Sequence, residues 1–158
     1  MPESWPTRLA RWGFNCFPAY RGTGARIESI ASDWLEVRVR LTLSWRSRND
    51  VGTLFGGSMY GAVDSIYMVM LIKTLGPGFV VWDKAATIRF LRPGRATLRA
   101  TFRLPADAPD RLREDARTRG KVEREFQVNL VDAGGQVYAT CTKRLHIRWR
   151  PGTADRGA

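Results

Sequence analysis

The feature that most constrains this chain is an apolar segment that carries a single carboxylate. Residues 51–72 contain one charge, Asp64, and four glycines in 22 positions. This is nearly the length of a membrane span, but a central Asp disfavours insertion by roughly 2.5 to 3.5 kcal/mol. We therefore expect a buried core helix in a globular protein.

Asp64 is the candidate functional residue of that helix. Burying an isolated carboxylate costs several kcal/mol or more, so the side chain should be paired, held protonated or placed beside a reacting group. A solvent-facing Asp on an otherwise buried helix is the alternative. Acidic groups in apolar surroundings are enriched at functional sites, which favours a role in chemistry.

Strands and turns surround the apolar segment. Residues 35–44 alternate apolar and polar side chains, which predicts a half-buried strand, and residues 26–32 are its hairpin partner. Residues 4–17 open with a Ser and an early Pro and predict a short helix, which residues 18–24 break. Two further hairpins are predicted, 81–91 with 97–104 and 122–131 with 137–149, separated by a polar connection at 105–120.

This order of elements predicts an α+β fold in which an antiparallel sheet wraps one long helix. The helix is apolar nearly all round, so we expect a second subunit to cover the face that the sheet leaves bare. At 158 residues the chain is long enough for one domain. We divide it into an N-terminal helix and linker at 1–24, a main domain at 25–150 and a flexible tail at 151–158.

Charge and cysteine content limit the classes of partner. The net charge is +11, and the basic residues are spread along the chain rather than clustered. This attracts anionic ligands but gives no nucleic-acid stripe, so we expect no nucleic-acid partner. Because Asp64 interrupts the one apolar segment of nearly membrane-spanning length, we expect no membrane partner either. Two cysteines make neither a disulfide framework nor a metal pattern, and the first residues lack a signal peptide. We expect a cytoplasmic protein without a metal.

The spacing of Asn49, Phe55-Gly56-Gly57 and Asp64 resembles that of hotdog-fold acyl-coenzyme A thioesterases, particularly the phenylacetate-pathway branch. Those relatives carry an Asn, a His-Gly-Gly six residues later and an Asp nine residues after the His. Phe55 stands here in place of the His. Residues 87–94 resemble the family's strand ending in Pro-Gly, and the element order matches a hotdog fold from about residue 25 to 149. Residues 52–58 and 82–84 are similar to a subgroup with Gly-Thr-x-Phe-Gly-Gly-Ser and Trp-Asp-Lys.

The resemblance implies a hotdog-fold thioester hydrolase with Asp64 as general base or nucleophile. Gly56, with Gly57 beside it, would supply backbone N–H groups that stabilise an oxyanion at the helix start. Two helical turns, roughly 10 Å, separate these glycines from Asp64 in one chain, so each site should combine the glycines of one subunit with Asp64 of the other. We expect a homodimer, with a tetramer left open.

Two further residues have alternative interpretations. Asn49 would orient the water or the thioester, or it closes an ordinary turn with Asp50. Asp83 would assist the attacking water and share a proton with Asp64, or it forms a structural ion pair with Lys84.

The substrate's coenzyme A phosphates call for a basic rim, and no separate cofactor is implied. The candidates are basic side chains near a turn or on the last strand, which are otherwise solvated strand charges: Arg89, Arg92, Arg95, Lys143 and Arg144. The only histidine, His146, lies on the last strand and is predicted to be at the surface. Because Phe55 replaces the family's His, a non-catalytic protein that binds or senses acyl-coenzyme A is the alternative function.

Overall fold

The fold is a six-stranded antiparallel sheet with helices on one face and at its edges. A computed structural model describes residues 2–150, so the tail predicted at 151–158 lies outside the described residues. The spatial strand order is β1-β2-β4-β5-β6-β3. The strands are β1 (Ala25–Ile30), β2 (Glu36–Leu41), β3 (Phe79–Phe90), β4 (Leu98–Arg103), β5 (Lys121–Val131) and β6 (Val137–Trp149).

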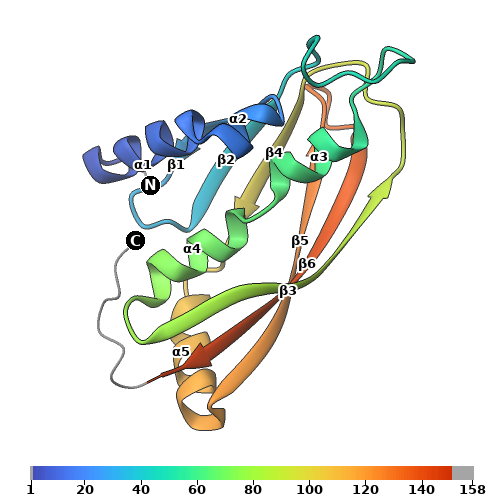
Figure 1. Cartoon of the computed structure of the whole chain (residues 1–158). Helices are drawn as coiled ribbons and strands as arrows, with labels where there is room; N and C mark the ends of the chain where they lie inside the picture. Colours follow the sequence, from blue (N-terminus) through green and yellow to red (C-terminus); the bar gives the residue numbers. More distant parts are fainter. Residues whose placement is uncertain (1, 151–158) are drawn as a thin grey trace.

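The central helical segment runs across one face of this sheet, as Figure 1 shows. It consists of α3 (Gly56–Val63) and α4 (Ile66–Leu75), and its buried residues include Ala62, Met70 and Leu71. The predicted single helix is interrupted because Asp64 is extended, with ψ 148°, and Ser65 is left-handed, with φ 62°. The interruption frees the side chain of Asp64 from the regular helix surface.

The alternating segment forms β2 as predicted and pairs with β1 in the expected hairpin. Val37, Val39 and Leu41 point into the core, and the intervening side chains lie outward. Strands β5 and β6 also form the predicted hairpin. In these strands one face is buried and the other is polar, which is the condition under which a period of two predicts register.

The predicted hairpin between residues 81–91 and 97–104 is wrong. Strand β3 pairs with β6 along its whole length, whereas β4 pairs with β2 and β5. The Pro93-Gly94 segment does not turn the chain back, because the Gly94 carbonyl accepts a hydrogen bond from the Leu54 N–H at 2.8 Å. A Cβ on Gly94 would lie 2.8 Å from Leu54 Cδ1, so this close approach requires glycine.

The polar connection predicted at 105–120 contains a helix, α5 (Ala108–Arg119). Pro109, Leu112 and Ala116 are buried on one side of α5, and most of its other residues are charged. Pro109 in the first turn and Gly120 at the C-cap are the usual end signals of a helix. The prediction missed it because only a narrow apolar stripe marks the helix.

Two short helices precede the sheet: α1 (Trp5–Cys16) and α2 (Pro18–Gly22). The predicted cap of α1 is present, since Ser4 and Thr7 form a reciprocal capping box. Residues 18–24 end α1, as predicted, but residues 18–22 of this segment form a second short helix, α2. Both helices lie at the β1 edge of the sheet, opposite the β3 edge (Figure 1). Between residues 2 and 150, no helix combines the length and apolar character that a membrane crossing requires.

Candidate functional site

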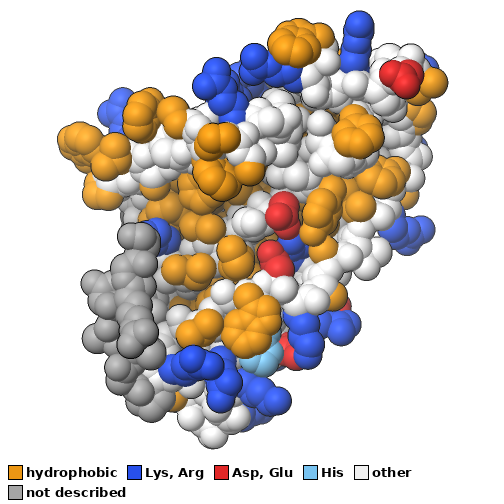
Figure 2. Space-filling view, viewed as in Figure 1, with side chains coloured by type: hydrophobic (Ala, Val, Ile, Leu, Met, Phe, Trp, Pro, Cys, Tyr) orange, Lys and Arg blue, Asp and Glu red, His pale blue; other side chains and the backbone are white. Residues whose placement is uncertain are grey.

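Asp64 lies in a cluster of charged side chains contributed by three elements. Lys143 of β6 donates a hydrogen bond from Nζ to Asp64 Oδ1 at 2.5 Å, and the same Nζ lies 3.1 Å from Asp83 Oδ2 on β3. The Lys143 side chain is only 2% exposed, whereas that of Asp64 is 41% exposed. The cluster therefore has a buried cation at its base and one carboxylate that reaches the surface. In Figure 2 acidic side chains lie in the middle of the viewed face, where Figure 1 places the α3–α4 junction.

The backbone explains how these groups meet. The break between α3 and α4 places Asp64 at the end of α3, where Ser65 Oγ donates to its Oδ2 at 3.3 Å. A bulge between Asp83 and Ala85 shifts the pairing of β3 with β6. Lys143 lies between the inward-facing Cys141 and Leu145, so the pleat of β6 directs it into the core.

The charges of the cluster stabilise one another. Burial alone would raise the pKa of Asp64, but the hydrogen bond and positive charge of Lys143 outweigh it and hold that pKa below its ordinary value. Burial alone would lower the pKa of Lys143, but Asp64 and Asp83 raise it. Burial also raises the pKa of Tyr60, whose Oη lies 3.5 Å from Lys143 Nζ. At neutral pH, Asp64 is therefore an ionised carboxylate and Lys143 a cation.

Asp83 is the least satisfied member of the cluster. Its Oδ1 is buried and has no hydrogen-bond partner among the described residues. The predicted alternative of a pair with Lys84 does not form, because Lys84 Nζ contacts Glu123 Oε1 at 2.5 Å. Lys143, rather than a shared proton, bridges Asp83 and Asp64. One buried acceptor of this cluster is thus available to a donor from outside the described chain.

The Gly-Gly pair begins α3, as predicted, and faces a separate hollow. Phe55 is the N-cap residue and gives no side-chain cap, and the first helical bond runs from the Met59 N–H to the Phe55 carbonyl. The N–H groups of the first turn have no acceptor within the helix itself. A Cβ on Gly56 would lie 3.1 Å from Phe90 Cζ, and one on Gly57 would overlap the Phe55 ring. Crowding by two aromatic rings therefore favours glycine at both positions.

The hollow at this helix start has a volume of about 470 Å³. It brings together four of the residues predicted for the site: Asn49, Gly56, Arg92 and Arg95. Its wall also includes apolar side chains, among them Met59 and Phe90. An apolar hollow with two arginines and free amides at one end suits a ligand with an apolar and an anionic part.

Asn49 is engaged in its own turn. Its Oδ1 accepts from the Thr53 N–H at 3.0 Å, and its Nδ2 donates to Thr53 Oγ1 at 2.9 Å. The turn therefore closes on Thr53 rather than on Asp50. This geometry fixes the loop before α3, and with it the position of Gly56.

The predicted basic rim separates into different environments. Arg92 and Arg95 border the hollow, and Arg89 is exposed on β3. Arg144 is paired with Glu125 at 2.7 Å. Lys143 does not lie on a rim, because its ammonium group is buried between two carboxylates. The expectation that it contacts phosphate is therefore corrected to a role inside the Asp64 cluster.

Lys143 is the residue whose place the sequence analysis missed. The sequence does contain a signal for its burial. Alternate residues of the strand share one face, and on the face of Lys143 the other residues are apolar: Cys141, Leu145 and Ile147. His146 was also misplaced: it is 8% exposed, and its ring stacks on Trp82 at 4.1 Å between centroids. Alternation alone does not predict this burial, because the Trp82 ring on the neighbouring strand covers the outward position.

The predicted residues form two groups within one chain. Asp64 lines a smaller hollow of about 190 Å³ between α2 and the central segment, together with Phe17 and Tyr20. The hollow at Gly56 does not include Asp64. Among residues 2–150, no three His, Cys, Asp or Glu side chains are grouped as metal ligands. A single subunit therefore presents the glycine amides and the Asp64 carboxylate on different hollows.

Comparison with known structures supports the fold. A protein of unknown function from Pseudomonas aeruginosa, described as a "Probable Thioesterase", is 26% identical with a TM-score of 0.81, covering 95% of this chain and 99% of its own. A thioesterase from Haemophilus influenzae is 13% identical with a TM-score of 0.68, covering 97% of each chain. The PaaI protein of the E. coli phenylacetic acid degradation operon is 21% identical with a TM-score of 0.63, covering 94% and 93%.

These similarities establish the hotdog fold that the motif spacing predicted. A search of curated protein sequences finds no match. A family model described as "Domain of unknown function (DUF4442)" matches residues 7–147, which is most of the chain. The chain therefore belongs to the DUF4442 family and has the hotdog fold of thioesterase-like proteins.

Proposed function

We propose that this protein is an acyl-coenzyme A thioesterase whose sites each combine two subunits. The observation that carries the proposal is Asp64, an ionised carboxylate held by a buried lysine and partly open to solvent. Such a group can accept a proton from water or attack a carbonyl carbon directly. Its position in a fold shared with thioesterases supports a thioester as the substrate.

The helix start at Gly56 supplies the second requirement of the reaction. As the thioester carbon is attacked, negative charge develops on its oxygen, and N–H groups of Gly56 and Gly57 would donate hydrogen bonds to it. Collapse of the intermediate breaks the carbon–sulfur bond, and water adds overall to give a carboxylic acid and a thiol. Arg92 and Arg95 beside this hollow would bind the anionic part of coenzyme A.

Two features support a dimer in which the hollows meet. Strand β3 is at the edge of the sheet. Three of its large apolar side chains are exposed, and so is the residue that follows it: Val80, Trp82, Phe90 and Leu91. An exposed apolar edge strand is a ready surface for pairing with another chain. A two-fold contact at this edge would bring Asp64 of one subunit towards Gly56 of the other.

Hydrolysis of a panel of short, long and aryl acyl-coenzyme A thioesters, followed by release of the free thiol, tests the proposal. We expect turnover by the wild type and a loss of at least about a hundredfold in Asp64→Asn, because the proton acceptor is removed. Asp107→Asn, which changes an exposed carboxylate at the start of α5 outside the Asp64 cluster, is the matched control. A wild type without turnover on every ester would contradict the proposal.

A non-catalytic acyl-coenzyme A binder is the second candidate, and Phe55 favours it. This side chain is 55% exposed at the start of α3 and offers no hydrogen-bond donor, unlike the histidine of the relatives it resembles. Calorimetry distinguishes the two candidates. Binding that Asp64→Asn leaves unchanged, with no hydrolysis, would support the binder.

A further inference from the structure

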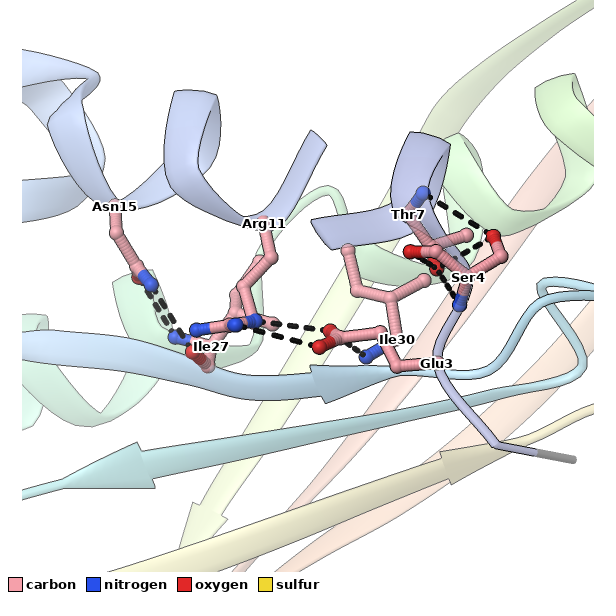
Figure 3. Close-up of polar contacts among 7 residues, drawn as sticks. All are labelled: Glu3, Ser4, Thr7, Arg11, Asn15, Ile27 and Ile30. Atoms are coloured by element: carbon pink, nitrogen blue, oxygen red, sulfur yellow. Dashed lines mark hydrogen bonds and ion pairs between the residues drawn. The ribbon is translucent and has the colours of Figure 1, made fainter. Parts of the chain in front are cut away.

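Helix α1 faces the protein with several polar side chains as well as Ala10 and Phe14, and it presents large apolar side chains to solvent. Figure 3 shows the inner contacts. Asn15 accepts from the Ile27 N–H at 2.8 Å and donates to the Ile27 carbonyl at 3.0 Å. Glu3 accepts from the Ile30 N–H at 3.2 Å and is held by Arg11 at 2.8 Å. These polar groups satisfy the free backbone edge of β1, so the orientation of α1 is fixed by specific bonds.

The outer side of α1 is an aromatic stripe, which we define as Trp5, Leu9 and Trp12. Leu9 follows Trp5 by four residues and Trp12 follows Leu9 by three, so the three side chains lie on one face of the helix. They are 72%, 55% and 67% exposed. Figure 2 shows hydrophobic side chains gathered at the upper left, over the position of α1 in Figure 1. Large apolar side chains grouped on a surface mark a site of contact with another apolar phase or molecule.

The uncompensated charge at the stripe is positive, because Glu3, the one acid that lines its hollow, is paired with Arg11. Neither α1 nor α2 contains an acidic residue, and both Arg8 and Arg21 are exposed. Within residues 2–150, neither guanidinium forms an ion pair. Arg8 also borders a shallow hollow of about 410 Å³ together with the stripe. A cation beside indole rings and an aliphatic side chain matches an occupant that is anionic at its surface and apolar beneath.

A second copy of the chain fits this surface poorly. Two antiparallel stripes packed about a two-fold axis would bring their Arg8 side chains together without an acid to compensate. Glu3, the nearest acid in the sequence, is already held by Arg11 and by the Ile30 N–H. The stripe also lies at the β1 edge, away from the β3 edge that we assign to the dimer.

We propose that the stripe of α1 docks this protein on the surface of an anionic phospholipid bilayer. Trp5 and Trp12 would lie at the level of the headgroups with Leu9 inserted below them, and Arg8 and Arg21 would contact lipid phosphates. The helix lies on the membrane and does not cross it. This proposal revises the expectation of no membrane partner, which rested on the absence of a spanning segment.

Co-sedimentation of the full-length protein with vesicles tests the proposal. One set of vesicles contains phosphatidylcholine alone. The other set is anionic and contains about 30% phosphatidylglycerol in phosphatidylcholine. We expect binding to the anionic vesicles that weakens as salt is added. Trp5→Ser combined with Trp12→Ser should lower the partition coefficient about tenfold or more, and Arg8→Gln about fivefold.

The matched control is Arg119→Gln, which removes an equal charge from the exposed end of α5. It should bind as the wild type does if the stripe, rather than net charge, is responsible. Circular dichroism melting should show that all variants are folded, because the changed side chains are exposed. Equal binding by the wild type and the double Trp variant would overturn the proposal. A second result would also overturn it: the wild type does not bind vesicles, and light scattering shows a self-association that the double Trp variant loses.

Discussion

At the scale of single residues, the central finding is that Asp64 is paired with a buried lysine. The surroundings of the Asp64 carboxylate keep it ionised. Burial alone would raise its pKa, but the hydrogen bond and charge of Lys143 lower it by more. A lowered pKa makes the carboxylate a weaker base but keeps it charged at neutral pH. The cluster therefore favours a role in positioning and activating water or in direct attack.

The pH dependence of stability should report this pair. Because the pKa of folded Asp64 is below its ordinary value of 3.8, its contribution is present above that value and is lost as pH falls through the lower folded pKa. Urea unfolding of the wild type and Asp64→Asn should therefore differ at pH 7 and converge in acid. A gap that stays constant from pH 7 to strongly acidic solution would contradict this account, and Asp107→Asn should show no comparable gap.

Removing the cation should be more damaging than removing one carboxylate. Lys143→Met leaves Asp64 and Asp83 side by side without compensation, and we expect a loss of about 2 to 4 kcal/mol in unfolding free energy. In this background Asp83→Asn should restore part of the loss, whereas Asp83→Asn alone should destabilise. Chemical denaturation of the four proteins forms a double-mutant cycle. Additive effects would show that the two residues do not interact.

At the scale of elements, the break between α3 and α4 determines where Asp64 points. Ser65 has a positive φ, a conformation that side chains with a Cβ adopt at a cost of about 1 kcal/mol. The smaller hollow beside Asp64 and the Asp64 cluster both depend on this local departure from a continuous helix. The break is therefore a structural requirement of the site.

Substitutions at Ser65 should follow backbone preference. We expect Ser65→Gly to leave the unfolding free energy unchanged or to raise it by as much as about 1 kcal/mol. Ser65→Val should lower it by about 1 to 2 kcal/mol. Ser65→Ala is the control for the loss of the hydroxyl, which contacts Asp64. Thermal melting of the three variants measures the order. A Val variant as stable as the Gly variant would exclude a left-handed residue at this position.

Helix α5 is held to the sheet by its narrow apolar stripe. Leu112 is 4% exposed, so Leu112→Ala should lower the unfolding free energy by about 2 to 4 kcal/mol. Glu114→Ala, on the exposed side of the same helix, should change it by no more than about 0.5 kcal/mol. Equal effects of the two changes in denaturant unfolding would argue against the packing of α5 described here.

Prediction from sequence succeeded where one local pattern determines the structure. Alternation in β2 indicated both the strand and its inward face, and the motif around Gly56 located the start of α3. It failed where distant segments decide: β3 pairs with β6, some 60 residues away, and the residue that Lys143 contacts lies on another element. The charged surface of α5 hid its helical period because three buried residues, one of them a proline, give a weak signal.

At the scale of the whole molecule, the account depends on two subunits completing each other's sites. One chain presents the Gly56 amides and Asp64 on separate hollows. An exposed apolar edge at β3 offers the surface on which a second subunit could join them. This arrangement leaves the α1 stripe of each subunit outward and available.

The most direct test is activity restored by mixing two inactive chains. Gly56→Pro removes one amide donor at the first helical position, where the backbone tolerates proline, and the extended Phe55 before it is compatible with proline. The exposed Phe90 ring, which a Cβ at this position would contact, has to shift slightly. Asp64→Asn removes the base. After co-refolding in equal amounts, half of the dimers should be mixed and one of their two sites intact, so we predict about a quarter of wild-type activity. A mixture no more active than its parents would contradict the shared site.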